Sequence, residues 1–164
     1  MGNLLPKSDI PTSATQPVPK GSSNSIRTTW IAPSSTVKNA KQAASDVQAA
    51  FTAYPQEGQA DIDKGGWEIA EGSFEEGKFR VEFTSGSGIF AKLLNGGKGF
   101  KDDVLVEIMP KDQGTAKDNK NWCAEVRSSS RLGKSDLGVN QKRLTFLAEK
   151  MRDKGWEAPK PEYP

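Results

Sequence analysis

The feature that most constrains the fold is the alternation of apolar and polar residues from residue 67 onward. Successive side chains of a β-strand point to opposite faces, so this alternation predicts strands with one buried and one solvated face. Four runs show it, with apolar members Trp67 and Ile69; Phe79, Val81 and Phe83; Val104, Val106 and Ile108; and Trp122, Ala124 and Val126. Residues 75–77, Glu-Glu-Gly, predict a hairpin turn between the first two runs.

Two stretches with apolar residues at three- and four-residue intervals flank these strands and predict amphipathic helices. The first is expected from about Thr36 to Tyr54, with Ser34 or Ser35 as its N-cap. The second is expected to be capped by Ser135 or Asp136 and to end at Gly155. Its expected buried residues are Val139, Leu144, Leu147, Ala148 and Met151.

A short edge strand near residues 26–31 precedes the first helix, and Pro33 ends it. The resulting order, β-α-β-β-β-β-α, predicts an α+β fold in which an antiparallel sheet of four to five strands has two helices packed on one face. A chain of 164 residues forms one such domain, and we expect it to span residues 26–156.

The proline-rich segments 1–25 and 157–164 are expected to be extended arms. Proline fixes φ and lacks a backbone donor, and the few apolar residues in these segments cannot offset the entropy of ordering them. The first arm is therefore either a disordered tail or a polyproline-like strap that lies along a partner.

Composition excludes several chemistries. The chain has no histidine, so a Ser-His-Asp or Cys-His site cannot form within it. Cys123 is the single cysteine, which excludes an internal disulfide and an all-cysteine zinc site. The 23 basic and 21 acidic residues nearly cancel, which argues against a nucleic-acid-coating role. We expect no cofactor and no metal site, and a protein that is peripheral to membranes, because no apolar run approaches the ~20 residues of a membrane span.

The run RSSSRLGKSDLGVNQKR, residues 127–143, holds the densest group of polar and charged residues. Its candidate residues are Arg127, Ser128, Ser130, Arg131, Ser135, Asp136, Asn140 and Arg143, together with Asp102 and Asp103 on the preceding strand. One interpretation is a partly buried ion-pair network between these arginines and aspartates. The other is an anion pocket beside the N-terminus of the last helix. The adjacent carboxylates at 102 and 103 point to opposite faces of a strand, so they cannot form an acid-base pair.

This run, together with the strand at residues 79–83 and the Phe-x-Asp-Asp sequence at 100–103, resembles the signature of the domain of unknown function family 1499. The resemblance covers about residues 30 to 152 and implies the fold described above. The glycine-rich segment at residues 85–100 and the two arms are similar to those of plastid members from photosynthetic algae, which include a soluble subunit that accompanies photosystem I in diatoms.

The resemblance implies a noncatalytic accessory subunit that docks on a photosynthetic membrane complex, with photosystem I favoured. We expect it at the chloroplast thylakoid surface, on the stromal side in preference to the lumen, bound to subunits of the photosystem core. The expected docking residues are Pro17, Pro19, Ile89, Phe90, Leu93, Leu94 and Trp156. The alternative is a module that binds a small anion or a lipid headgroup through the arginine cluster. An enzyme with Asp102 or Asp103 as base is disfavoured without histidine.

Overall fold

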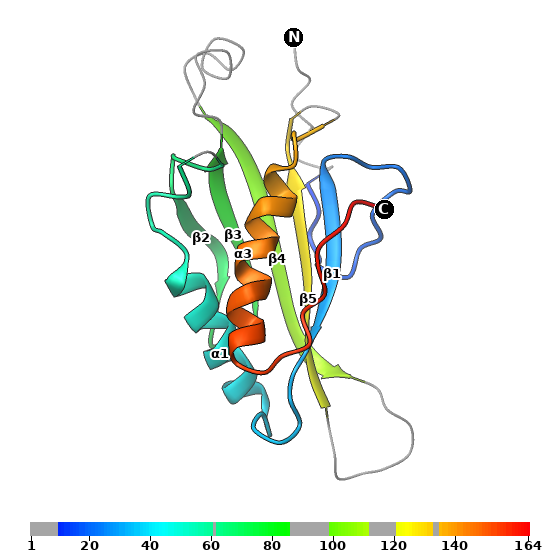
Figure 1. Ribbon diagram of the computed structural model, residues 1–164, viewed down its shortest axis with the longest axis vertical. Coiled ribbons are helices and arrows are strands. Elements are labelled where there is room, and N and C mark those ends of the chain that lie inside the picture. Colours follow the sequence, from blue (N-terminus) through cyan, green and yellow to red (C-terminus); the bar gives the residue numbers. More distant parts are fainter. Residues whose placement is uncertain (1–9, 61, 86–98, 112–120, 133–134) are drawn as a thin grey trace.

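The computed structural model describes residues 10–60, 62–85, 99–111, 121–132 and 135–164. A five-stranded antiparallel sheet with strand order β1-β5-β4-β3-β2 forms its centre. The strands are β1 (Ser25–Ile31), β2 (Trp67–Ser73), β3 (Lys78–Ser85), β4 (Phe100–Lys111) and β5 (Asn121–Ser130). The helices α1 (Ala40–Ala53) and α3 (Val139–Asp153) both cover one face of this sheet (Figure 1). The predicted α+β order is confirmed.

The core lies between the two helices and the face of the sheet that carries the alternating apolar residues. In β3, Phe79, Val81 and Phe83 are buried as their alternation predicts. The prediction was wrong for Ile69 in β2, which lies opposite Val81 but is 38% exposed. Because β2 is an edge strand, its side chains have a neighbouring strand on one side only, and a register shift follows directly after Ile69.

Helix α1 begins later than the sequence predicts. Its N-cap is Asn39, whose Oδ1 accepts a hydrogen bond from the backbone N–H of Gln42 at 2.9 Å. Ser34 and Ser35 do not cap it, because the backbone N–H groups of the next two residues, 36 and 37, bond to the carbonyl of Pro33 in a separate turn. The buried stripe of the helix comprises Ala43, Ala44, Val47, Ala50 and Phe51.

Helix α3 has Gly138 as its N-cap, in the left-handed conformation with φ 81°. Asp136, one of the two predicted caps, lies two residues before the N-cap but still caps the start of the helix. Its carboxylate accepts from the backbone N–H groups of Gly138 at 2.8 Å and Asn140 at 3.0 Å. Ser135 accepts from the N–H of Leu137 at 3.3 Å. Four of the five expected buried residues are buried, and Val139 is half-buried. Asn140 and Arg143 are also buried in this helix, and the sequence did not predict their burial.

The N-terminal segment, residues 10–24, packs on the face of the sheet opposite the helices. Ser13 and the backbone N–H of Ala14 donate to Glu107 of β4 at 2.5 and 3.0 Å, and Ala14 is fully buried. The carbonyls of Gln16 and Pro17 accept from Arg127 of β5 at 2.7 and 2.8 Å. The segment contains two short turns, and its hydrogen bonds to Glu107 and Arg127 hold it against the sheet.

The C-terminal tail is extended and packs against the domain. It runs back beside α3 and β1 (Figure 1), where Glu157 forms a bridge with Ile31. Trp156, expected to dock a partner, is 3% exposed, and its indole N–H donates to Asp46 at 2.9 Å. Its place is therefore in the core, because the tail folds its large apolar ring against the domain.

Candidate functional site

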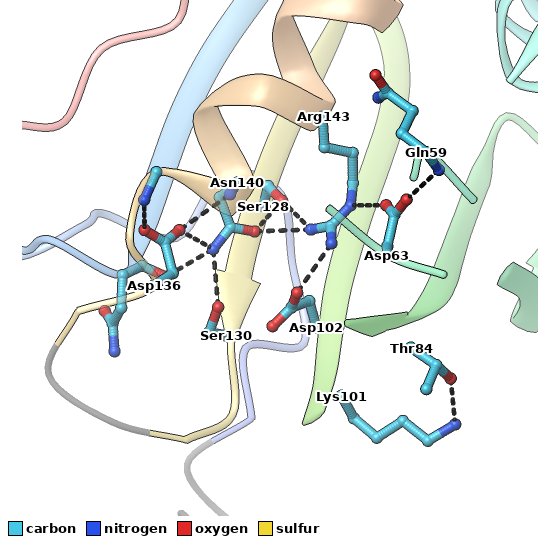
Figure 2. Close-up of polar contacts among 12 residues, drawn as sticks. Gln59, Asp63, Thr84, Lys101, Asp102, Ser128, Ser130, Asp136, Asn140 and Arg143 are labelled. Atoms are coloured by element: carbon cyan, nitrogen blue, oxygen red, sulfur yellow. Dashed lines mark hydrogen bonds and ion pairs between the residues drawn. The ribbon is translucent and has the colours of Figure 1, made fainter. Parts of the chain in front are cut away.

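Arg143 of α3 lies at the centre of a buried ion-pair cluster on the helix-covered side of the sheet (Figure 2). Its guanidinium donates to Asp102 at 2.8 Å, to Asp63 at 2.9 Å and to Asn140 Oδ1 at 2.9 Å. Burial by itself lowers the pKa of Arg143, but the charges of Asp102 and Asp63 raise that pKa above its ordinary value. Arg143 therefore stays charged while fully buried.

Asn140 joins β5 to the turn that precedes α3. Its amide donates to Ser130 Oγ at 2.9 Å and to Asp136 Oδ2 at 2.5 Å, and the Ser128 hydroxyl lies against its Oδ1 (Figure 2). Tyr163 of the C-terminal tail donates its hydroxyl to Asp136 at 2.6 Å. Burial and this carboxylate raise the pKa of Tyr163, so the hydroxyl remains a donor. These contacts fasten the last helix to two serines of β5 and fasten the turn before the helix to the C-terminal tail.

Asp103 points to the opposite face from Asp102, as strand alternation predicts. It accepts two hydrogen bonds from Arg131, at 2.6 and 2.7 Å, and one from Arg80 at 2.8 Å. Glu82 pairs with Arg131 at 2.7 Å and with Lys101 at 2.8 Å. Burial raises the pKa of Glu82, but the hydrogen bonds from Lys101 and Arg131 bring the pKa below its ordinary value. This second cluster is thus a connected ion-pair network on the outer face.

Arg127 departs from the predicted pairing. Asp136 was expected as a partner for one of the arginines, but it is engaged by helix amides and by Tyr163 on the other side of the sheet. Arg127 instead donates to Ser129 Oγ at 3.2 Å and to two backbone carbonyls of the N-terminal segment. It is 7% exposed and forms no ion pair with the residues that the structure describes.

Sequence reasoning missed several members of these clusters, among them Tyr54, Asp63, Arg80 and Glu82. Arg80 and Glu82 alternate with the apolar residues of β3, so pairing β3 with β4 places Glu82 opposite Asp103 and would have found them. Asp63 follows α1 in a loop without periodicity, and no local pattern marks it. The Tyr54 hydroxyl donates to Asp63 at 2.7 Å, in a contact that only the fold creates.

The expected docking residues that the structure describes lie outside the two ion-pair clusters. Pro17 and Pro19 are exposed in the N-terminal segment, while Trp156 is buried. The remaining expected docking residues, Ile89, Phe90, Leu93 and Leu94, lie outside the described residues.

The arrangement is suited to structural clamping, because the charged side chains of both clusters are bonded to one another across several elements. Within the described ranges, no group of three histidine, cysteine, aspartate or glutamate side chains could hold a metal ion. Cys123 is buried, and burial together with the Glu125 charge raises the pKa of its thiol, which makes it a poor nucleophile. Among the same residues, no helix is long and apolar enough to cross a membrane.

Together, the fold and the site define a small α+β domain in which two ion-pair clusters, one on each face of the sheet, lock the last strand to its neighbours. The chain belongs to the family of proteins of unknown function DUF1499, whose model matches residues 9–151. The match confirms the family resemblance and extends it into the N-terminal segment. Searches of curated proteins and of solved structures found no match.

Proposed function

We propose that this protein is a noncatalytic accessory subunit that docks on a photosynthetic membrane complex, with photosystem I favoured. The choice of complex rests on the resemblance to plastid members of the family, and it places the protein at the chloroplast thylakoid surface, on the stromal side. The observation that carries a docking role is the conformation and exposure of Leu137.

Leu137 is 87% exposed and is the one residue other than glycine that has a positive φ, 55°, in the described part of the chain. The left-handed conformation costs an L-residue roughly 1–2 kcal/mol. An exposed leucine gains nothing from burial that would offset this cost. Such outliers persist where the surroundings impose them, and they cluster at functional contacts.

The surroundings of Leu137 do impose its conformation. Ser135 accepts from its backbone N–H, and Asp136 accepts from the next N–H, that of Gly138. Asp136 is itself held by Tyr163, and Ser135 forms a bridge with Ser23. The polar residues of the 127–143 run therefore hold a rigid turn that presents one apolar side chain. This supports docking in preference to catalysis, because those polar groups are engaged with each other.

Exchanging Leu137 for asparagine separates docking from folding. Asparagine tolerates the left-handed conformation, so Leu137→Asn keeps the turn and removes the apolar contact. Ile69→Thr is the matched control, because Ile69 is the other exposed large apolar residue of the described chain and threonine retains strand propensity.

Tagged protein is mixed with detergent-solubilised thylakoid membranes and separated on a sucrose gradient. We expect the wild type and Ile69→Thr to sediment with photosystem I, and Leu137→Asn to stay at the top with unchanged urea stability. Wild-type protein that never sediments with a photosystem, or Leu137→Asn that sediments like wild type, would refute the docking proposal.

A second candidate function, binding of a small anion or headgroup, is favoured by one different observation. Arg131 and Arg143 are engaged in ion pairs, whereas Arg127 lacks a carboxylate partner among the described residues.

A further inference from the structure

A cavity of about 480 Å³ lies between the N-terminal segment and the outer face of β5. Residues 10, 11 and 19–25 form one wall, and Asp103, Arg127, Ser129, Ser130 and Arg131 form the other. Its volume falls within the range of small-ligand sites, about 300–1,000 Å³. The N-terminal segment, expected to be either a disordered tail or a strap along a partner, therefore forms one wall of a cavity.

No carboxylate in the described part of the chain pairs with Arg127. Arg27 is its direct cross-strand partner and adds a second positive charge beside it. The nearest acid on that strand pair, Glu125, is bound by Arg27 at 3.1 Å and by Thr29 at 3.0 Å. Burial lowers the pKa of Arg127, and the Arg27 charge lowers this pKa further. A cation buried beside another cation is costly unless an anion accompanies it.

The adjacent ion-pair network cannot supply that anion. Asp103 lines the cavity, but its carboxylate is bound by Arg80 and Arg131. The network contains three acids and three bases, so its formal charge is zero: Glu71, Glu82 and Asp103 against Arg80, Lys101 and Arg131. Among the residues that the structure describes, Arg127 is therefore left as an excess positive charge at the cavity wall.

Hydrogen bonds hold the guanidinium of Arg127 in place at the cavity wall. Its Nε and Nη1 are engaged by Ser129 and by the carbonyls of residues 16 and 17, which fix the plane of the guanidinium. Its Nη2 has no hydrogen-bond partner among the described residues. Lys20, exposed on the opposite wall, brings a second cation to the same cavity.

We propose that this cavity binds a tetrahedral oxyanion, a phosphate or sulfate group, through Arg127 and Lys20. A planar guanidinium with donors held in a fixed direction suits oxyanion recognition, and a flexible lysine adds a point charge. Arg127 also clamps the N-terminal segment, so one residue links ligand binding to the order of that segment. This site is separate from the Leu137 turn and does not depend on the docking proposal; it rests on the second candidate function, for which it names the anion class and the binding residues.

Binding is measured by calorimetry with inorganic phosphate and inorganic sulfate, at ionic strength held constant with sodium chloride. Phosphatidylcholine vesicles with and without phosphatidylglycerol distinguish a lipid headgroup from a free anion as the source. The variants are Arg127→Met and Lys20→Met, with Lys41→Met as the control because Lys41 is exposed on α1, away from the cavity.

We expect saturable binding of the free anion or of the phosphatidylglycerol vesicles by wild type and by Lys41→Met. Removing one charge-assisted contact should weaken binding about tenfold in Lys20→Met, and Arg127→Met should abolish it. If Arg127→Met fails to fold, as judged by circular dichroism, the comparison of anion binding between Lys20→Met and wild type tests the proposal. The proposal is overturned if wild type binds neither free anions nor anionic vesicles, or if Lys20→Met binds as wild type does.

Discussion

At the residue scale, buried charge dominates this molecule. Arg143, Asp63 and Asp102 are each at most 1% exposed, which is rare for charged residues unless they are paired. The cluster holds together because each carboxylate shares the same guanidinium, and because the Phe83 ring lies 4.4 Å below it. Removal of the cation should therefore cost more than the loss of its contacts.

Arg143→Met is expected to lower the free energy of unfolding by about 3–5 kcal/mol, because two buried carboxylates lose their counter-ion while the volume is nearly kept. Urea denaturation followed by tryptophan fluorescence measures this change. The control is Lys150→Met, since Lys150 is half-exposed and 3.9 Å from Asp153; its loss should be about 0–1 kcal/mol. A loss below about 1 kcal/mol for Arg143→Met would contradict the structural role assigned to the cluster.

At the scale of elements, the start of α1 shows how neighbouring polar residues compete. Ser34, Ser35 and Asn39 are all good N-caps by type. Pro33 decides among them, because its carbonyl accepts from the two N–H groups at 36 and 37 and so makes a separate turn. The helix can begin only after that turn, at Ala40.

Asn39→Ala should therefore lower the free energy of unfolding by about 0.5–2 kcal/mol, since the N–H of Gln42 loses its acceptor. Ser35→Ala is the matched control and should change stability by less than about 0.5 kcal/mol. Thermal and urea unfolding of the two variants measure the difference. Equal losses, or a larger loss for Ser35→Ala, would show that the helix begins earlier in solution.

At the scale of the whole molecule, both ends of the described chain are part of the domain. The N-terminal segment covers the outer face of the sheet, the tail covers the seam between α3 and β1, and the N–H of Gly21 bonds to the carbonyl of Pro164 at 3.0 Å. A single acidic residue, Glu107, anchors the N-terminal segment to the central strand.

This anchor should make stability depend on pH. Burial raises the pKa of Glu107, but hydrogen bonds from Ser13 and Ala14 bring the pKa below its ordinary value. A carboxyl whose pKa is lower in the folded state stabilises the fold above its unfolded pKa, about 4.3–4.5, and loses that contribution as pH falls through the folded pKa.

We therefore expect Glu107→Gln to lose less stability than wild type when pH falls from about 7 to about 3. Urea unfolding at the two pH values measures this, with Glu149→Gln, at an exposed position of α3, as the control for charge removal. An identical loss in wild type and Glu107→Gln would show that the segment is not anchored by this carboxylate.

The parts of the fold that the sequence could predict are those with local causes. Alternation in β3, β4 and β5 and the three- and four-residue spacing in both helices follow from the geometry of single elements, so the order and the fold class were confirmed. Alternation also separated Asp102 from Asp103. Alternation did not predict the exposure of Ile69, because β2 is an edge strand and the burial of its side chains depends on whether other elements cover that edge.

The run at 127–143 was recognisable from sequence as the polar centre of the chain and as the family signature. The partners of its residues could not be recognised from sequence. Asp63 lies 80 residues before Arg143 in the chain, and the carbonyls that hold Arg127 lie about 110 residues before it. Such contacts depend on the register of β5 between β1 and β4 and on the docking of the N-terminal segment. The sequence by itself therefore determined which residues form strands, helices and the charged run. Only the tertiary structure decided which charges neutralise each other and which arginine at the cavity wall has no carboxylate partner among the described residues, because ion pairing requires distances of a few ångströms that no local pattern sets.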